Sequence, residues 1–466
     1  MDRDANEIVG PRDDPSGQAP AGRGPTRRQV LKYGLGGVAL AGAGTAGYYL
    51  LRAATQAASD AAVIFKNDAP KGELWELWKQ RGWVAEARYY HPLGRNVLCK
   101  VCPNECLLEP EDRGRCRNKV NKDGKLYTLA YGNPCSFHTD PIEKKPLYHF
   151  LPGTKVFSIA TSGCGFRCMN CQNWDISQRK PEELKDPRGE QCRMSPDRLR
   201  QLIATEAHEL TKAHPELSAD DVRDYLMRRD LDRLSMFPDD VVGIAEMLNS
   251  PSISYTYSEP TSYYEYMLDT AKLARQKKIK NVWVTCGYIQ EKPLLELCDY
   301  LDAATVDLKS FDDAIYRKLN SGKLQPILDT LKTVKKCGVW LEVSYLVVPT
   351  YTDDKEMLRR MCGWLVENIG TDYPLHFLRF HPAHKLNHLP PTPVNTLQDA
   401  GAIAKASGLR HVYLGNVPGV KDAGTTFCPG CGKPVIERDV FAPRSINMAD
   451  GKCKFCGAGL LGVWSA

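Results

Sequence analysis

Three cysteines that follow an apolar run directly are the residues best placed to do chemistry: Cys164, Cys168 and Cys171. Their C-x3-C-x2-C spacing puts three thiolates on one short loop. Thiolates are the usual ligands of a [4Fe–4S] cluster, and three of them leave one iron free to bind a substrate or cofactor. Gly163 and Gly165 suit a loop that bends around a bulky cluster, because glycine adopts positive φ at little cost. Buried structural cysteines or part of a zinc site are the alternatives.

Two further groups of cysteines have the spacing of metal sites. The N-terminal group consists of Cys99, Cys102, Cys106 and Cys116. It can close a tetrahedral zinc site, which is the interpretation we favour, hold a second iron–sulfur cluster, or form disulfides in an oxidising compartment. The C-terminal group consists of Cys428, Cys431, Cys453 and Cys456. Its two C-x2-C pairs are typical of a zinc ribbon, with a cluster as the alternative.

Short β-branched or aromatic runs alternate with amphipathic segments from residue 155 onwards, and this pattern predicts a parallel α/β sheet. The expected strands are 155–160, 253–257, 282–285, 305–308, 339–348, 376–380 and 411–414. The expected helices are 262–277, 292–301, 325–335, 354–369 and 397–407. So many strand–helix units predict a full or partial (βα) barrel of the TIM type, with small cysteine-rich modules at both ends.

Polar residues follow several of the expected strands. In order along the chain they are Cys164, Glu259, Thr285, Asp307, Lys309 and His381. Chemistry in such barrels collects at the carboxyl ends of the strands. We therefore expect these side chains to meet around one site.

The length of 466 residues and the 42% hydrophobic content allow a large core in more than one domain. We expect a lead and signal segment at 1–60, a cysteine-rich module at 61–150, a core barrel at 151–420 with a helical insertion at about 180–250, and a zinc-ribbon-like module at 421–466. Helices of the insertion should begin after Ser195 and Ser218. The net charge of +6 includes no basic block that would predict nucleic-acid binding.

Arg27 and Arg28 follow a polar lead and precede a Gly/Ala-rich apolar run at 33–51. A twin arginine before a mildly apolar segment predicts a twin-arginine export signal. A run of about 20 residues can also cross a bilayer. We expect membrane association through this segment, as an anchor or uncleaved signal or as a signal that is cleaved, and the sequence leaves the face of the membrane open.

A charged and aromatic run at 140–149 leads directly into the first expected barrel strand. Its position would let it lie over the mouth of the active site. A solvated loop is the alternative for each of its members.

The C-x3-C-x2-C loop after the first strand resembles the signature of the radical S-adenosylmethionine (SAM) superfamily. The chain is similar to the branch of the pyruvate formate-lyase activating enzyme, and more closely to the radical SAM proteins of the AmmeMemoRadiSam system. This resemblance covers roughly residues 95–465. It is carried by Cys102-Pro, the string DPIEKKPLYHFLPG at 140–153, Cys171-Gln-Asn-Trp, the string YTYSEPT at 255–261, and the terminal cysteine ribbon.

The resemblance implies that Cys164, Cys168 and Cys171 hold the cluster and that SAM chelates the free iron through its amino and carboxylate groups. It further implies that Glu259 accepts a hydrogen bond from the SAM amino group and that Asp307 and Lys309 flank SAM. His381, in Phe-His-Pro, would lie near the ribose. Thr285, at the end of the third strand, completes the expected SAM contacts.

The chain departs from the family pattern at two positions. The residue before the last cluster cysteine is usually aromatic and contacts the adenine, whereas here it is Asn170, so Tyr288 or Trp174 would have to supply that contact. The glycines of the Gly-Gly-Glu motif are replaced by Tyr257 and Ser258.

The function implied is one-electron reduction of the cluster and cleavage of SAM to methionine and a 5′-deoxyadenosyl radical, which abstracts hydrogen from a substrate. A flavodoxin- or ferredoxin-type donor would supply the electron, and the sequence does not identify the substrate, for which a protein is one candidate. A glycyl-radical enzyme activase and an exported iron–sulfur electron carrier are the alternatives. A carrier needs neither an open iron nor a SAM pocket.

Overall fold

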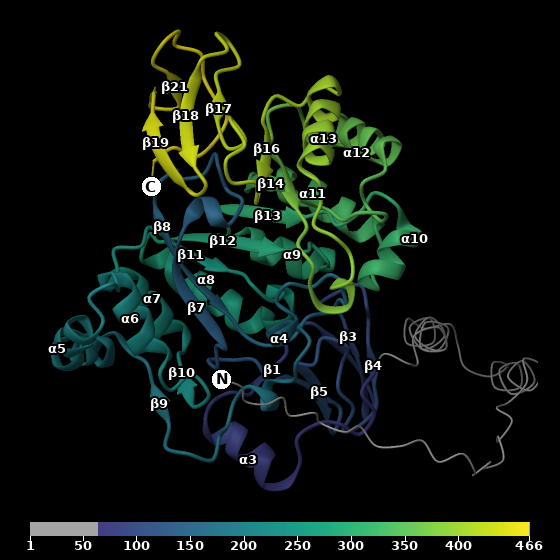
Figure 1. Cartoon of the computed structure of the whole chain (residues 1–466). Helices are drawn as coiled ribbons and strands as arrows, with labels where there is room; N and C mark the ends of the chain where they lie inside the picture. The colour runs from purple at the N-terminus through teal and green to yellow at the C-terminus, as the bar shows by residue number, and fades with distance from the viewer. Residues whose placement is uncertain (1–63, 466) are drawn as a thin grey trace, which may run out of the picture. The chain divides into compact units, whose positions relative to one another are not determined.

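A computed structural model describes residues 64–465, and its centre is one sheet of eight strands (Figure 1). Seven strands are parallel and follow one another in chain order, while β7 lies antiparallel at one edge and β16 forms the other. The strands are β7 (Ser136–Pro141), β8 (Lys155–Ala160), β11 (Ser252–Tyr255), β12 (Lys280–Thr285), β13 (Ala303–Asp307), β14 (Trp340–Val347), β15 (Leu375–Arg379) and β16 (Val412–Gly415). The fold is a partial (βα) barrel, as the sequence predicts.

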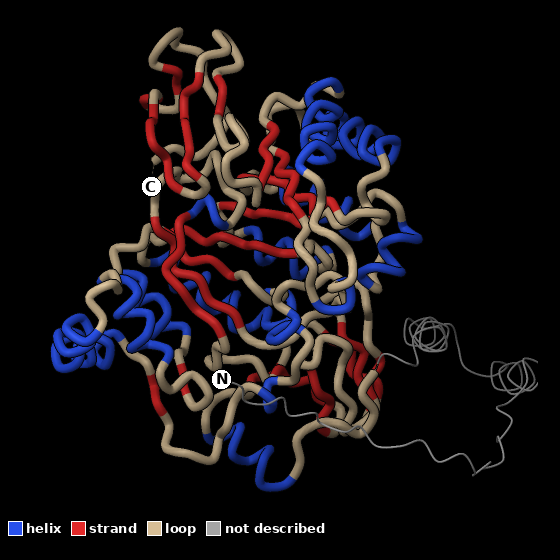
Figure 2. Tube along the Cα trace, in the orientation of Figure 1, coloured by secondary structure: helices blue, strands red, loops and turns tan. Residues whose placement is uncertain are grey.

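Five helices alternate along the chain with the parallel strands of this sheet. They are among the helices drawn in blue in Figure 2. They are α8 (Tyr264–Gln276), α9 (Glu291–Cys298), α11 (Gln325–Lys336), α12 (Lys355–Asn368) and α13 (Val394–Ala406). All five expected helices and all seven expected strands are confirmed, with boundaries that differ by a few residues. The strands carry side chains buried on both faces, which explains their nearly continuous apolar and small-residue sequences.

The segment before β7 forms a module of small antiparallel sheets. Its elements are α3 (Gly72–Gln80), β1 (Ala85–Glu86), β2 (Tyr90–Leu93), β3 (Asn96–Cys99), β4 (Leu107–Leu108), β5 (Lys119–Lys122) and β6 (Lys125–Thr128). The sheets have the orders β1-β6-β5 and β2-β3-β4. A small core around Trp78, Trp83 and Leu129 packs α3 against the first of them.

The segment between α4 (Trp174–Ser177) and β11 contains three helices and a short pair of strands. They are α5 (Pro196–Ala213), α6 (Ala219–Arg228), α7 (Pro238–Met247), β9 (Cys192–Arg193) and β10 (Leu234–Ser235). The predicted helix starts are confirmed, because the Ser195 and Ser218 hydroxyls accept hydrogen bonds from the backbone N–H groups of Arg198 and Asp221.

The C-terminal segment forms a small antiparallel module with its own core. Its strands are β17 (Thr426–Phe427), β18 (Pro434–Asp439), β19 (Ala442–Ile446), β20 (Met448–Ala449) and β21 (Lys452–Cys453). Arg438 of β18 donates a hydrogen bond of 2.6 Å to the carbonyl of Tyr148 and lies over its ring. These contacts attach the module to the run at 140–149.

The interpretation of 140–149 as a solvated loop is wrong for most members of the run, although Pro141 and Lys144 are exposed. Asp140, Glu143, Lys145 and His149 are buried. Each has a partner: Lys145 donates to Asp140 within the run at 2.5 Å, and the Glu143 carboxylate accepts from Gly153 N–H at 2.9 Å. The His149 ring lies 2.9 Å from the Leu461 carbonyl. Burial of charge is tolerated here because the groups are paired.

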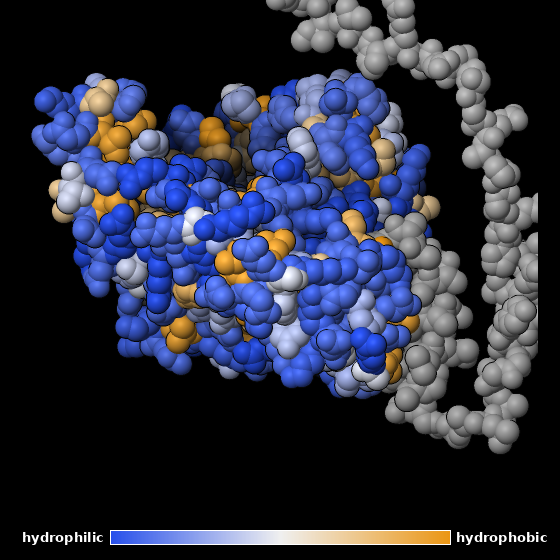
Figure 3. All heavy atoms as spheres, turned by 90° about the horizontal axis from the view of Figure 1, so that it is seen from below, coloured by the Kyte–Doolittle hydropathy of each residue, from blue (hydrophilic) through white to orange (hydrophobic). Residues whose placement is uncertain are grey.

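The twin-arginine motif and the apolar run at 33–51 lie outside the described residues. Within 64–465, no helix combines the length and the apolar character needed to cross a bilayer. On the face drawn in Figure 3, hydrophilic side chains dominate and apolar ones gather only in small, separate areas.

A buried ion pair joins the N-terminal module to the barrel. Lys119 of β5 and Glu265 of α8 each expose 2% of the side chain and are hydrogen bonded to one another. We predict that Lys119→Met lowers the free energy of unfolding by about 3–5 kcal/mol, because it leaves the Glu265 charge buried without its cation. Urea unfolding followed by circular dichroism measures this loss.

The double variant Lys119→Met/Glu265→Gln is the matched control, since it removes the uncompensated charge and should recover much of the loss. If the single variant were as stable as the parent protein, this ion pair would not hold the two parts together.

Candidate functional site

The three cysteines of the C-x3-C-x2-C loop lie just beyond the carboxyl end of β8, and each sulfur lies within hydrogen-bonding distance of a donor. The backbone N–H of Phe166 donates to Cys164 Sγ at 3.3 Å, and the Asn320 side-chain amide donates to Cys168 Sγ at 3.2 Å. The Ser177 hydroxyl lies 3.1 Å from Cys171 Sγ. Donors at the sulfurs favour the thiolate form that metal ligation requires.

Burial opposes that ionisation in the absence of metal. It raises the pKa of the Cys168 thiol to about 11, while the nearby Lys309 cation lowers it. Burial also raises the pKa of Cys164 well above its usual range, and the Glu259 carboxylate adds to the effect. Loading a cluster here therefore releases protons from buried thiols.

The start of this loop is fixed by close contact with the N-terminal module. Gly163 has a φ of 91°, and a Cβ at this position would lie 2.4 Å from the carbonyl oxygen of Cys116. The Asn118 side-chain amide donates to the Ser162 carbonyl at 2.6 Å and to the Ser262 hydroxyl at 3.0 Å. Only glycine allows the Cys116 carbonyl to lie this close to the loop, so the cluster loop packs directly on the N-terminal module.

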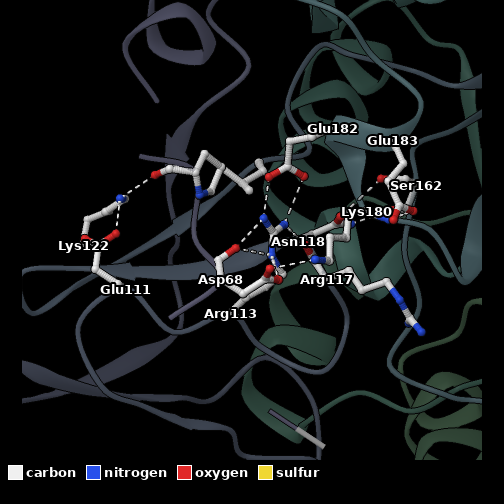
Figure 4. Close-up of polar contacts among 12 residues, drawn as sticks. Asp68, Glu111, Arg113, Arg117, Asn118, Lys122, Ser162, Lys180, Glu182 and Glu183 are labelled. Atoms are coloured by element: carbon white, nitrogen blue, oxygen red, sulfur yellow. Dashed lines mark hydrogen bonds and ion pairs between the residues drawn. The ribbon is translucent and has the colours of Figure 1, made fainter. Parts of the chain in front are cut away.

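Ion pairs extend the same contact, as Figure 4 shows. Arg113 is almost fully buried and pairs with both Asp68 and Glu182. Arg117 donates to the Cys164 carbonyl at 3.4 Å and to the Gln178 side chain at 3.0 Å. These contacts attach the segment after the cluster loop, which contains Gln178 and Glu182, to the N-terminal module.

A cavity of about 420 Å³ opens beside the three cysteines at the carboxyl ends of the barrel strands. Glu259 lines it, and its carboxylate accepts hydrogen bonds from the Thr285 hydroxyl at 2.7 Å, the Cys286 N–H at 2.9 Å and Thr261. These bonds fix the carboxylate at the cavity wall. A carboxylate held in this way can accept a further bond from a ligand amine.

Asp307 and Lys309, at the end of β13, line the same cavity and are paired at 2.9 Å. The Ser344 hydroxyl donates a further hydrogen bond to Asp307. Burial alone would lower the pKa of Lys309, but the adjacent Asp307 carboxylate and nearby thiols raise it. Lys309 therefore remains a cation at neutral pH and faces the cavity from the strand end.

The structure brings together all but one of the side chains expected around this site. The lining includes Cys164, Cys168, Cys171, Glu259, Thr285, Asp307 and Lys309. His381 is exposed and is not among the lining residues, so a role near a ribose remains a prediction. Trp174 is exposed and stacked on His384, and Tyr288 packs on Phe166 behind the loop.

Asn170, the residue before the last cysteine of the loop, also lines the cavity. It is buried, and its Oδ1 atom has no hydrogen-bond partner within residues 64–465. A buried acceptor at a cavity wall is satisfied by a ligand donor at little cost. This orphaned oxygen and the hydrogen-bonded sulfurs fit a cluster with a polar cofactor beside it.

The run at 140–149, which was expected near the mouth of the site, contributes Tyr148 to the cavity lining, and His376, which the sequence did not single out, also lines it. The His376 Nε2 atom lies 2.6 Å from the buried carboxylate of Glu342. Burial opposes ionisation of Glu342, but the hydrogen bond from His376 holds its pKa at about 2. The backbone N–H groups of Tyr148 and His149 also donate to this carboxylate. The sequence signal that could have predicted this pair is a polar residue within each of two largely apolar strands, Glu342 in β14 and His376 in β15.

The C-terminal cysteines form a separate and tighter group. The four sulfurs of Cys428, Cys431, Cys453 and Cys456 all lie within 4.8 Å of one another. Two of their separations are 3.5 Å and 3.8 Å. Bonds of 2.3 Å to one tetrahedral zinc ion would place sulfurs about 3.8 Å apart. This group is therefore suited to one metal ion.

Comparison with known proteins decides the family. The sequence model described as the radical SAM superfamily matches residues 158–362. The chain belongs to the radical SAM superfamily. The uncharacterized protein MJ0808 of Methanocaldococcus jannaschii, with no stated activity, is 40% identical over 377 residues, which are 80% of this chain and 98% of that protein. The superfamily implies a [4Fe–4S] cluster and SAM.

One activating enzyme is a more distant relative of this chain, and a crystal structure of a domain of another was found by structure comparison. The pyruvate formate-lyase-activating enzyme of Clostridium pasteurianum is 26% identical over 129 residues, 28% of this chain and 53% of that enzyme, so the match spans about half of its length. A crystal structure of a domain of the same kind of enzyme from Bacteroides vulgatus matches with a TM-score of 0.32 and 16% identity, over 35% of this chain and 99% of that domain.

The Asn320 contact gives a direct test of the cluster loop. Asn320 ends a π-helical turn, Tyr316–Asn320, and donates to Cys168 Sγ. Because hydrogen bonds to the sulfurs raise the reduction potential of a cluster, we predict that Asn320→Leu shifts it negative by about 60 mV, the one-electron equivalent of a tenfold change. Redox titration of the SAM-free cluster, followed by electron paramagnetic resonance, measures the shift.

Gln325→Leu is the control, since Gln325 pairs with Asp329 on the exposed side of α11. An unchanged potential in Asn320→Leu would mean that Cys168 is not a cluster ligand.

Proposed function

We propose that this protein reductively cleaves SAM and uses the resulting radical to abstract hydrogen from a substrate bound in the barrel cavity. One observation supports this most strongly. A single cavity is lined by the three cysteines of the loop, by the hydrogen-bonded Glu259 carboxylate and by the Asp307–Lys309 pair. A cluster-based electron carrier has no use for such a cavity.

Each lining group has a definite task in this proposal. Cys164, Cys168 and Cys171 would hold the cluster. Glu259 would accept a hydrogen bond from the SAM amino group, and its own bonds to Thr285 and Cys286 would keep the carboxylate in place. Lys309 would contribute positive charge beside the cluster and the SAM carboxylate.

When bound, the cluster and SAM supply a one-electron cleavage that yields methionine and a 5′-deoxyadenosyl radical. The chain orients the reactants and keeps solvent away. The segment from Glu143 to Tyr148 lines the cavity on the β7 side, and Phe441 of the β18–β19 turn reaches the same cavity from the C-terminal module. These parts would cover the bound substrate.

Tyr148 and His376, which also line the cavity, are proposed to contact the substrate. Glu342 would orient the His376 ring through its hydrogen bond. Asn170 would offer its unpaired carbonyl oxygen to the adenine amino group, in place of an aromatic contact.

Activation of a glycyl-radical enzyme is the second candidate function. It is favoured by the relationship to the pyruvate formate-lyase-activating enzyme of Clostridium pasteurianum. It would require a partner protein whose glycine loop enters the cavity. The string at 140–153 favours the AmmeMemoRadiSam branch instead, and the apolar run at 33–51 would tether the enzyme to a membrane.

The central assay is anaerobic incubation of the reconstituted protein with SAM and dithionite. We predict 5′-deoxyadenosine as a product, and we predict that Cys168→Ala reduces it to the level of a reaction without enzyme. Chromatography with mass detection quantifies it. Cys337→Ala, at an exposed cysteine far along the chain from the loop, is the control and should retain the activity.

Equal amounts of 5′-deoxyadenosine from Cys168→Ala and the parent protein would contradict the assignment of the cluster loop. Addition of candidate substrates in deuterated form then distinguishes the two functions, because 5′-deoxyadenosine gains deuterium only when the radical abstracts it from the true substrate.

The C-terminal cysteine group is proposed to hold zinc. We predict that Cys431→Ser/Cys456→Ser loses about one zinc ion per chain, because two of the four ligands are gone. Elemental analysis after gel filtration measures this loss, and Cys337→Ser should keep the metal. Iron that depends on Cys431 and Cys456 would contradict the zinc assignment.

A further inference from the structure

The N-terminal cysteines converge in the fold although they come from separate turns. Cys99 ends β3, Cys102 and Cys106 lie in the turn towards β4, and Cys116 lies in the turn before β5. The Cys99 N–H donates to the Cys106 carbonyl at 2.9 Å. The thiol of Cys102 lies within electrostatic range of the other three. The four thiols therefore lie near one another in the fold.

The spacing of these sulfurs differs from that of the C-terminal group. The four C-terminal sulfurs all lie within 4.8 Å of one another, and no other group of three or more metal-ligating side chains in residues 64–465 is as tight. A mononuclear zinc site needs sulfurs about 3.8 Å apart. In a cluster each thiolate binds a different iron, so its ligands stand further apart. The three cysteines of the C-x3-C-x2-C loop likewise form no group as tight as the C-terminal one.

The N-terminal group lies directly against the C-x3-C-x2-C loop. The Cys116 carbonyl touches Gly163, and the Asn104 side chain donates to the Gly165 carbonyl at 3.1 Å. Cys99, Cys102 and Cys116 also line a small cavity of about 20 Å³ together with Phe166 and Cys286. A centre held here would lie next to the loop that carries the first cluster.

Positive charge lies between the two groups of cysteines. Arg117 is within electrostatic range of both Cys116 and Cys164. Arg167 is within range of both Cys106 and Cys164, and Arg115 is close to it. Burying like charges together is costly unless anions lie nearby. Thiolates of a metal centre supply that charge, whereas the neutral sulfurs of a disulfide do not.

We propose that Cys99, Cys102, Cys106 and Cys116 hold a second iron–sulfur cluster, which relays electrons to the SAM-binding cluster. With four protein ligands this cluster has no open iron, which suits it to electron transfer. A reduced protein donor of the flavodoxin or ferredoxin class gives up one electron to it, and the same electron passes to the first cluster. The relay rests on the proposed cleavage of SAM, whereas the presence of the second cluster does not.

Metal and sulfide analysis of the full chain tests the second cluster. The parent protein, reconstituted anaerobically, should contain about eight iron and eight sulfide per chain, as expected for two [4Fe–4S] clusters. The variant Cys164→Ala/Cys168→Ala/Cys171→Ala should keep about four of each. Adding Cys102→Ser and Cys106→Ser to that variant should remove the remainder, while Cys431→Ser should leave the iron content of the parent protein unchanged.

Two outcomes would overturn the proposal. One is about four iron per chain in the parent protein together with zinc that depends on Cys102 and Cys106, and the other is a triple variant that binds no iron or sulfide. The count in the parent protein needs no variant to fold. Because neither measurement uses SAM, a failure here is distinct from a failure to form 5′-deoxyadenosine.

The relay has its own readout. In Cys102→Ser/Cys106→Ser, formation of 5′-deoxyadenosine should fall at least tenfold with a reduced flavodoxin as donor, yet stay within twofold with dithionite, a small reductant. Equal loss with both donors, or no loss with flavodoxin, would contradict the relay.

Discussion

The contact between Gly163 and the Cys116 carbonyl is the constraint on which the rest of the site depends. Three thiolates can face one cluster only if the loop that carries them turns sharply at the end of β8. That turn is held from outside by the backbone of the N-terminal module, by Asn118 and by Arg117. The module before the barrel is therefore part of the active site, because it shapes the loop.

The other side of the cavity depends on a different interaction, the buried Glu342 carboxylate. It accepts hydrogen bonds from His376, from Trp340 and from the backbone of Tyr148 and His149. Burial, with His411 nearby, lowers the pKa of His149 to about 3, so its neutral ring accepts from Tyr413 and donates to the Leu461 carbonyl. One connected network thus joins β14, β15, the segment at 140–149 and the C-terminal module.

Local patterns predicted much of the fold and of the site. The β-branched runs predicted the barrel strands. Glu259, Asp307 and Lys309 could be predicted to lie at one site because they follow strand ends, and the carboxyl ends of parallel strands meet at one edge of the sheet. The burial of Glu143 and His149 could not be predicted, since their partners Arg438 and Leu461 lie about 300 residues further along the chain. Asn320 and His376 were missed because their partners, Cys168 and Glu342, lie on other elements and only the folded chain brings them together. The distances between cysteine sulfurs also could not be predicted, because spacing along the chain does not determine them.

The central claim is that the three thiolates of the loop leave one iron to which SAM binds. Electron–nuclear double resonance of the reduced cluster tests it most directly, with SAM carrying ¹⁵N in its amino group and ¹⁷O in its carboxylate. Our account predicts that both labels couple to the unpaired spin of the cluster. Bound SAM with neither label coupled would contradict it.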